Sequence, residues 1–335
     1  MAIDPKAADK LSKGWYKERL SSQDCKYLLE FTDHSSEANL AVSLANRLHH
    51  QACNGTGQIS AEIETVIGPC PGNCGFCKHA EGRSMESFWE IDDGSLAKIA
   101  EGLGLFSDVR SIRLTTCAYV DIDTVCRQVG IVRDNAKRGT RIYVNTRDLG
   151  PDDCRQLKAA GAYGAVHAPR LGEGKDTEIP LETRLDTMTN LVKSGLEVIT
   201  GVEPIGPEHS IEDIVDNFFL TLNMGCASCE LVPREPVPGT KFNQFGKLGQ
   251  SRFNQIRAVL TLGSSWYTAP HRVPYAGAYV TGGNVVVPKC NLSNYKERIE
   301  ASRRRLFNGG YDRILKVDDS TSELNMMYLR KTGSV

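Results

Sequence analysis

The regular alternation of short apolar runs with amphipathic segments constrains the fold of this chain most. Six runs rich in β-branched residues, each followed by a segment with helical spacing, stand at 61–68, 111–116, 141–145, 163–168, 196–204 and 229–235. Repeated β-then-α units build a parallel sheet through right-handed crossovers. The chain of 335 residues is long enough for one closed sheet of this kind. We therefore predict an α/β fold, a TIM-type β/α barrel that is full or nearly full.

The ends of the chain have a different pattern. Residues 1–58 contain apolar residues at helical spacing, interrupted at Asn54-Gly55. After the sixth unit the sequence is less regular, with one further strand expected at 280–288 and a helix at 294–310. We predict an N-terminal helical extension, 1–58, and a barrel with a C-terminal helix, 59–335.

Charge and hydropathy exclude several classes of partner. The chain has 40 Lys and Arg against 41 Asp and Glu, so it has no field that attracts nucleic acid or anionic lipid. Its apolar runs are shorter than the ~18 residues that cross a bilayer. The first 20 residues are charged throughout and do not resemble a secretory signal. We expect a cytosolic protein without nucleic-acid or membrane partners.

Three of the eleven cysteines are clustered directly after the first predicted strand. In GPCPGNCGFC, Cys70, Cys74 and Cys77 have the spacing C-x3-C-x2-C. The catalytic side of a β/α barrel is the carboxyl end of its strands. Three thiolates in a glycine-rich loop can hold one iron–sulfur cluster and leave one iron open, with glycines supplying positive φ angles. A zinc loop with His79 as fourth ligand is the alternative.

This loop resembles the cluster-binding loop of the radical S-adenosylmethionine (SAM) superfamily, which has an aromatic residue before the third cysteine. Phe76 occupies that position. The resemblance implies a 4Fe–4S cluster, SAM chelated to the open iron, and reductive cleavage of SAM to a 5′-deoxyadenosyl radical in the barrel mouth. It also implies oxygen sensitivity, a small-molecule substrate and an electron donor of the flavodoxin or ferredoxin type.

Three further segments resemble the biotin synthase-like branch of that superfamily. They are RLTTCAY at the second strand end, VPREPVPGT near the sixth strand, and LETRLDTM, whose Arg184 matches the arginine that binds the SAM carboxylate. Biotin synthase itself holds a second cluster on three cysteines and an arginine. Only Cys117 remains here, and Thr268 stands near the arginine position. We therefore infer that the chain is not biotin synthase.

Polar residues at the other strand ends are candidates for binding the cofactor or substrate. Thr115 stands where the family has a Gly-Gly-Glu element, and Asn145 ends the third strand. His167 and Arg170 could bind ribose hydroxyls or a substrate carboxylate, or be a core histidine and a surface arginine. Glu203 could bind adenosine or a substrate amine, or form a salt bridge. His209 and His271 are further candidates.

The remaining cysteines have several interpretations. Cys117 could be a packing residue, a contact to substrate or cofactor, or a hydrogen donor to a substrate radical. Cys226 and Cys229 precede the sixth strand, on the side of a barrel that confers stability, and could be structural or bind a metal. Isolated small core residues are expected at Cys25, Cys53, Cys126, Cys154 and Cys290.

The leading hypothesis is a radical SAM enzyme that abstracts hydrogen from a small organic substrate. A sulfur-inserting enzyme similar to the two-protein lipoyl synthase is the alternative among enzymes. A non-catalytic iron–sulfur or zinc-binding protein is the alternative of another class.

Overall fold

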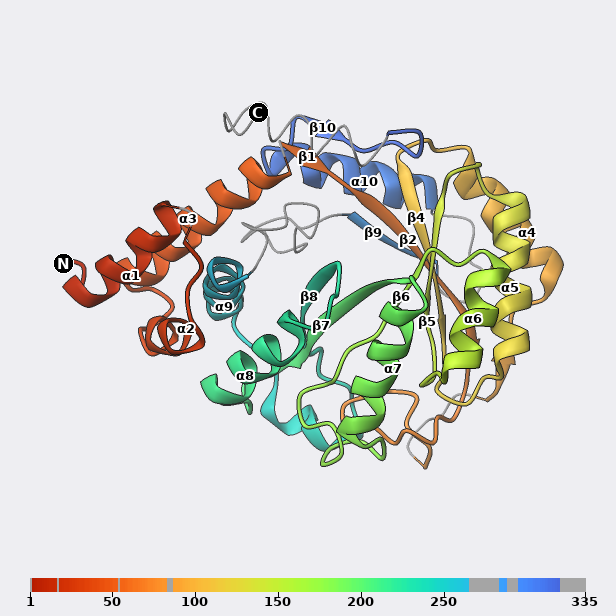
Figure 1. The fold of residues 1–335 in the computed structure, drawn as a ribbon, viewed down its shortest axis with the longest axis horizontal. Helices are drawn as coiled ribbons and strands as arrows, with labels where there is room; N and C mark the ends of the chain where they lie inside the picture. The colour runs from red at the N-terminus through yellow and green to blue at the C-terminus, as the bar shows by residue number, and fades with distance from the viewer. Residues whose placement is uncertain are drawn as a thin grey trace.

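The computed structural model describes residues 2–16, 18–53, 55–82, 87–264, 283–287 and 295–319. Its centre is a curled sheet of parallel strands (Figure 1). Their order is β9 (Gly283–Val287), β2 (Ile59–Ile67), β4 (Val109–Thr116), β5 (Arg141–Asn145), β6 (Gly164–Val166), β7 (Glu197–Ile205) and β8 (Ser228–Pro233). The short strand β3 (Trp89–Glu90) is antiparallel to the last residues of β2.

Helices follow the strands and cover the outer side of the curled sheet (Figure 1). They are α4 (Asp93–Gly104), α5 (Ile122–Asn135), α6 (Pro151–Ala160), α7 (Leu181–Lys193), α8 (Ile211–Leu222), α9 (Gln250–Gly263) and α10 (Tyr295–Asn308), with a 3-10 helix at Lys241–Phe245. The six predicted β-then-α units are confirmed, as are the later strand and helix. Local signals set the ends: Ser210 caps α8, and Gly161 ends α6 with a positive φ of 106°.

The sheet curls because its two faces have different partners. On β2, Ile59, Ala61 and Ile63 are buried in the core formed with the outer helices, so the residues between them face the interior. Inside, Arg113 on β4 forms an ion pair with Glu230 on β8, although β5, β6 and β7 lie between these strands. This contact across the interior confirms the β/α barrel fold. Among the described residues, no ladder of hydrogen bonds joins β8 to β9.

The N-terminal region is helical, as expected: α1 (Pro5–Trp15), α2 (Ser22–Leu29) and α3 (Ser36–Ala52) pack against α8 and α9. They share one apolar core with those helices. One feature differs from the expectation, because Thr56–Gly57 forms a strand, β1, with β10 (Arg313–Ile314). The sequence around Thr56 and Gly57 does not indicate a strand, because the strand is only two residues long and its partner lies near the other end of the chain. We keep the boundary at residue 58 as a proposal. None of the described helices is both long and apolar enough to cross a bilayer.

Candidate active site at the carboxyl ends of the strands

The three clustered cysteines lie on one loop that leaves the carboxyl end of β2 and folds back on itself. The Cys70 amide donates to the His79 carbonyl oxygen at 2.7 Å, and the Glu81 amide donates to the Cys70 carbonyl oxygen at 2.9 Å. Within the loop, the Cys77 amide donates to the Cys74 carbonyl oxygen at 3.0 Å. These bonds hold three half-buried cysteines in one turn at the catalytic end of the barrel.

The loop uses its glycines differently from the prediction. Positive φ occurs at Asn73 (43°), and neither Gly72 nor Gly75 has it. Asparagine tolerates this conformation because its short polar side chain is compatible with it. The glycines are needed for close approach instead, since a Cβ atom at Gly75 would lie 2.9 Å from the Phe242 ring. The expectation that glycines supply the positive dihedrals is therefore wrong for Gly72 and Gly75, whereas Gly68 (157°) and Gly82 (75°), at the two ends of the loop, do have positive φ.

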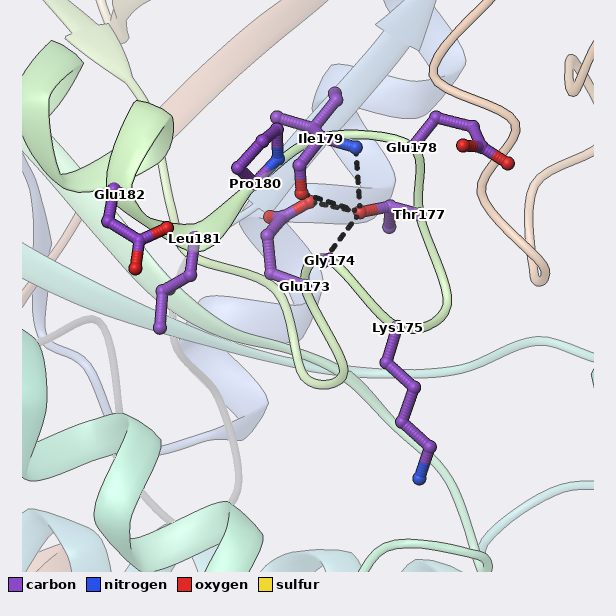
Figure 2. Close-up of a pocket in the computed structure, with 9 residues that line it drawn as sticks. All are labelled: Glu173, Gly174, Lys175, Thr177, Glu178, Ile179, Pro180, Leu181 and Glu182. Atoms are coloured by element: carbon purple, nitrogen blue, oxygen red, sulfur yellow. Dashed lines mark hydrogen bonds between the residues drawn. The ribbon is translucent and has the colours of Figure 1, made fainter.

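A second loop, which joins β6 to α7, supports the cysteine loop. The Gly75 amide donates to the Asp176 carbonyl oxygen at 2.7 Å, and the Glu178 amide donates to the Gly72 carbonyl oxygen at 2.9 Å. Residues 173–175 and 177–180 of the supporting loop, with the first two residues of α7, line an open hollow of about 510 Å³ (Figure 2). In Figure 2 the Thr177 hydroxyl points to Glu173, to whose carboxylate it donates at 2.6 Å. A hollow with both polar and apolar lining thus lies on the loop that supports the cysteine loop.

Cys117 lies directly beside Cys70. Its amide donates to the Val66 carbonyl oxygen at 3.1 Å, and its Sγ lies 3.5 Å from the Gly68 carbonyl oxygen. The interaction with Cys117, whose S–H donates to the Gly68 carbonyl oxygen, lowers the pKa of Cys70, and the amides of Ala118 and Gly72 lower it further. The same interaction raises the pKa of Cys117. The structure therefore brings Cys117 to the cysteine loop itself.

The three thiols of the loop are ligands of the kind that a metal cluster uses, although they do not point toward one common position. Within the part of the chain that the structure describes, no three His, Cys, Asp or Glu side chains are arranged around a common metal position. The Cys70 thiol is engaged with Cys117, and burial raises the pKa of Cys74 to about 11. Three thiols on one turn are nevertheless the ligands that iron–sulfur clusters use, and metal binding deprotonates such thiols.

Arg170 connects the cysteine loop with β7. Burial alone would lower its pKa, but the carboxylate of Glu203 and the thiols of Cys74 and Cys77 raise it overall. Its Nε lies 3.8 Å from the Glu203 carboxylate, too far for a hydrogen bond. The predicted residues Arg170 and Glu203 therefore lie together, and Arg170 is near enough to the cysteine loop to act on the pKa of Cys74 and Cys77.

Arg184 and His167 meet in a buried polar network. Asp148, which follows β5, lies 3.0 Å from His167 Nε2 and 3.2 Å from Arg184 Nη1. Arg184 Nε donates to Glu173 at 3.2 Å. Burial lowers the pKa of His167, so the ring is neutral and donates to Asp148. Arg184 Nη2 has no hydrogen-bond partner among the described residues. The sequence reasoning missed Asp148 and Glu173.

Three other predicted residues lie around the same end of the barrel. Thr115 donates to Glu62 at 3.0 Å, and it pairs in register with Asn145 at the end of β5. Phe76 is half-buried between the second and third cysteines. All three residues thus lie near the carboxyl ends of the strands, as predicted, but their contacts do not indicate what each side chain would bind.

A buried ion pair at the ends of β7 and β8 was not predicted. Arg234 Nε and Nη2 donate to the two carboxylate oxygens of Glu208 at 2.9 and 2.8 Å. Beside the pair, His209 accepts a hydrogen bond from the Gly206 amide at 3.0 Å. Glu208 stands in the segment after the fifth predicted strand and Arg234 within the sixth predicted run, which was the available signal.

The second cysteine pair lies at the opposite end of the barrel. Cys229 is buried in the first residues of β8, and burial raises its pKa; Cys226 precedes the strand. This location agrees with the structural interpretation of the pair. The candidates Thr268, His271 and Cys290 lie outside the described residues.

Comparisons with known proteins point to one group of enzymes. No family model matches the chain. A biotin synthase of Akkermansia muciniphila is 24% identical over 226 residues, which cover 64% of this chain and 68% of the relative. A biotin synthase of Saccharopolyspora erythraea is 24% identical over 235 residues, 67% of this chain and 65% of the relative. The matches thus span about two thirds of these relatives.

Solved structures share the fold over a larger part of the chain. A methylornithine synthase superposes with a TM-score of 0.76 at 15% identity and covers 94% of this chain and 99% of its own. The FeFe-hydrogenase maturase HydG of Carboxydothermus hydrogenoformans has a TM-score of 0.68 at 12% identity and covers 98% and 90%. These similarities show a common β/α barrel architecture.

Proposed function

Since this chain belongs to the radical SAM superfamily, in its biotin synthase-like branch, we propose that it abstracts hydrogen from a small organic substrate. It is an enzyme of that class, and the cofactors of the class are a 4Fe–4S cluster and SAM. When bound, these cofactors supply a 5′-deoxyadenosyl radical on receipt of one electron.

The observation that carries this proposal is the position of the cysteine loop. Cys70, Cys74 and Cys77 leave β2 at the carboxyl end of the sheet, where β/α barrels hold their active sites. In the proposal these three thiolates hold the cluster, and Phe76 lies between the second and third ligands. Cys117 contacts Cys70 and is a positioning residue toward the cluster.

The other rim residues bind and orient the cofactor. Arg184 is fixed by Asp148 and Glu173, so its remaining nitrogen, Nη2, donates to the SAM carboxylate. Neutral His167 completes this network by holding Asp148. Four side chains around it contact the remaining polar groups of the cofactor or the substrate: Thr115, Asn145, Arg170 and Glu203.

The enzyme also needs a cellular compartment that keeps its cysteines reduced and a protein that donates the electron. Thiolate ligands persist in a reducing compartment, so we propose a cytosolic location. A flavodoxin or ferredoxin type of donor supplies the electron. The sulfur-inserting alternative needs a sulfur source, and Cys226 and Cys229, at the opposite end of the barrel, do not supply one at the site.

Anaerobic reconstitution with iron and sulfide tests the proposed function. With dithionite and SAM, the loaded protein should form 5′-deoxyadenosine, which liquid chromatography detects. The omission of dithionite should abolish it. A loaded protein that binds iron but forms none would support the non-catalytic iron–sulfur protein, and one that binds zinc alone would support the zinc loop.

Replacement of Cys117 should change the cluster without removing it. Cys117→Ala should keep full iron content, because Cys70, Cys74 and Cys77 remain. It loses the S–H that donates to the Gly68 carbonyl oxygen in the structure and, in the proposal, to the cluster-bound Cys70 sulfur. A bond of this kind is worth about 0.5–1.5 kcal/mol, so its loss should lower the midpoint potential of the cluster by ~20–60 mV. Redox titration followed by electron paramagnetic resonance measures this, and Cys117→Ser should recover part of the shift. Loss of iron would make Cys117 a ligand, and an unchanged potential in both variants would leave it as packing.

A further inference from the structure

Cys117 is a fourth cysteine beside the three proposed cluster ligands, and it comes from a different strand. It stands directly after β4, whose Thr116 pairs in register with Val66 of β2. The Cys117 amide donates to the Val66 carbonyl oxygen at 3.1 Å, and its thiol donates to the Gly68 carbonyl oxygen at 3.5 Å. Cys117 is therefore fixed at the point where the chain leaves β2 and enters the cysteine loop.

Cys70 has its closest thiol partner in Cys117. The two thiols interact directly, and the Cys70 thiol also lies at the backbone amide of Ala118, the residue that follows Cys117. In contrast, Cys70 changes the pKa of Cys74 and Cys77 only through its charge, which acts over a longer distance. Cys70 thus lies nearer to a cysteine of the neighbouring strand than to the other cysteines of its own loop.

The packing around Gly68 keeps the two thiols together. A Cβ atom at Gly68 would lie 3.0 Å from the Phe88 Cα atom and 3.1 Å from the Tyr119 hydroxyl oxygen, so the start of the loop is enclosed on that side. The next residues are held by the Cys70 amide, which donates to the His79 carbonyl oxygen at 2.7 Å. A disulfide needs Cα atoms about 4.4–6.8 Å apart and facing Cβ atoms, so thiols already in contact need little backbone movement to join.

The two cysteines differ in exposure as the members of a redox pair do. Cys70 is half-buried at the carboxyl end of the barrel, where a small oxidant can reach it. Cys117 is only 6% exposed, so it reacts with a partner that already lies next to it. Cysteines that sense oxidants combine an accessible thiol with a neighbouring thiol that resolves the first product. Cys70 and Cys117 occupy these two positions.

We propose that Cys70 and Cys117 form a reversible disulfide while the cluster is absent, and that this bond prevents cluster loading until it is reduced. The disulfide takes up the sulfur of one proposed ligand, so only Cys74 and Cys77 remain to hold a cluster. Once the cluster is bound, Cys70 is occupied and the disulfide does not form. The inference rests on the proposed function for its effect on cluster loading, whereas the disulfide itself needs no radical chemistry.

A small-molecule disulfide such as oxidised glutathione is the oxidant in this reaction. The Cys70 thiolate attacks one sulfur of oxidised glutathione, whose S–S bond breaks and releases one glutathione thiolate. The Cys117 thiolate then attacks the Cys70 sulfur of the mixed disulfide and releases the second glutathione thiolate. The protein loses two protons and two electrons, and oxidised glutathione is reduced to two molecules of glutathione. Thiols such as glutathione reverse the reaction in a reducing cytosol.

The full-length protein without its cluster provides the first test, under anaerobic conditions. It is reduced, freed of reductant, incubated with oxidised glutathione and alkylated, and tandem mass spectrometry of its peptides then assigns the linked cysteines. We expect a Cys70–Cys117 linkage as the main product, with about two thiols lost per chain. The cluster-loaded protein, treated in the same way, should not form this linkage.

The effect on loading is measured with a synthetic 4Fe–4S cluster that has exchangeable thiolate ligands, added without free thiol or sulfide. The oxidised protein should take up at least about fivefold less iron than the reduced protein, because one of three ligands is blocked. Dithiothreitol should restore the uptake. A Cys70–Cys117 disulfide that leaves iron uptake unchanged would overturn the proposed effect on loading.

Cys117→Ala removes the resolving thiol, so the variant should take up as much iron after oxidised glutathione as before it. Its iron uptake in the reduced state reports whether the variant folds. Cys126→Ala, which removes a half-buried cysteine of α5, is the matched control and should keep the wild-type sensitivity. A main linkage between Cys70 and Cys74 or Cys77, or sensitivity retained in Cys117→Ala, would contradict the inference.

This inference and the proposed function fail separately. If the disulfide forms and blocks loading, but the loaded protein forms no 5′-deoxyadenosine, the proposed function is wrong and the redox pair stands. If the loaded protein forms 5′-deoxyadenosine, but Cys70 and Cys117 stay reduced in oxidised glutathione, the redox pair alone is wrong.

Discussion

Replacement of Cys70, Cys74 and Cys77 together by alanine should remove all bound iron and abolish 5′-deoxyadenosine formation. The reconstituted wild-type protein should contain about four irons and four sulfides per chain, because these cysteines are the one set grouped at a strand end. Iron and sulfide assays measure the loss, and the brown colour should disappear. The expected effect on activity is complete, since SAM cleavage needs the electron that the cluster delivers.

The control for this triple variant is the second cysteine pair. Cys226→Ala/Cys229→Ala should retain the iron content and the 5′-deoxyadenosine yield, because the pair lies at the amino end of β8. A wild-type content of about eight irons that halves in this double variant would contradict the single-cluster interpretation. Iron retained in the triple variant would locate the cluster elsewhere.

The strands and the cysteine loop were predictable because their signals are local. Each apolar run lies between residues that end helices, such as Gly161, or begin them, such as Ser210. The cysteines also need no partner from a distant part of the chain to be recognised. The element order and the place of the cysteine loop after the first strand of the six repeated units were therefore predictable from the sequence.

The ion pair inside the barrel could not be predicted, because it depends on a contact that no local sequence pattern contains. Arg113 and Glu230 are 117 residues apart, and they meet only because the sheet curls. A signal was nevertheless present, since Glu62 and Glu64 alternate with apolar residues in the first run and Glu230 stands within the sixth. In an ordinary barrel those inward positions hold branched apolar residues, so charges there indicate a polar interior.

The network around Arg184 contains partners that the sequence did not reveal. The family resemblance placed Arg184 at the site, and the structure adds that its Nε and Nη1 are engaged by Glu173 and Asp148. These carboxylates come from loops after two different strands, so sequence spacing could not connect them. The consequence is that Arg184 has a structural task in addition to the proposed contact with SAM.

Replacement of Arg184 should therefore have two separable effects. Arg184→Ala leaves two carboxylates without their cation, and the Glu173 side chain is 1% exposed. The loss of one partner of a buried ion pair costs about 3–5 kcal/mol of unfolding free energy. The variant would also lose the proposed charge-assisted bond to the SAM carboxylate, worth ~1.5–3 kcal/mol, so SAM binding should weaken roughly 10–150-fold.

Arg184→Lys separates these effects. Lysine keeps the positive charge between Asp148 and Glu173, so most of the stability should remain, as thermal unfolding measures. Lysine lacks the planar guanidinium group, which can donate to two carboxylates and to a third acceptor at once. The loss of SAM affinity should therefore persist in this variant. Arg234→Lys, at the buried pair with Glu208, is the matched control for disruption at the same end of the barrel.

Anaerobic titration of the cluster-loaded variants with SAM decides the role of Arg184. Weaker SAM binding in Arg184→Lys than in Arg234→Lys, at equal iron content, would support Nη2 as the donor to the cofactor. Equal affinity in the wild type and in Arg184→Lys would mean that this arginine stabilises the loop between β6 and α7 and does not bind SAM. The carboxylate of the cofactor would then need another cation, and Arg170, which lies beside the thiols of Cys74 and Cys77, is the next to replace.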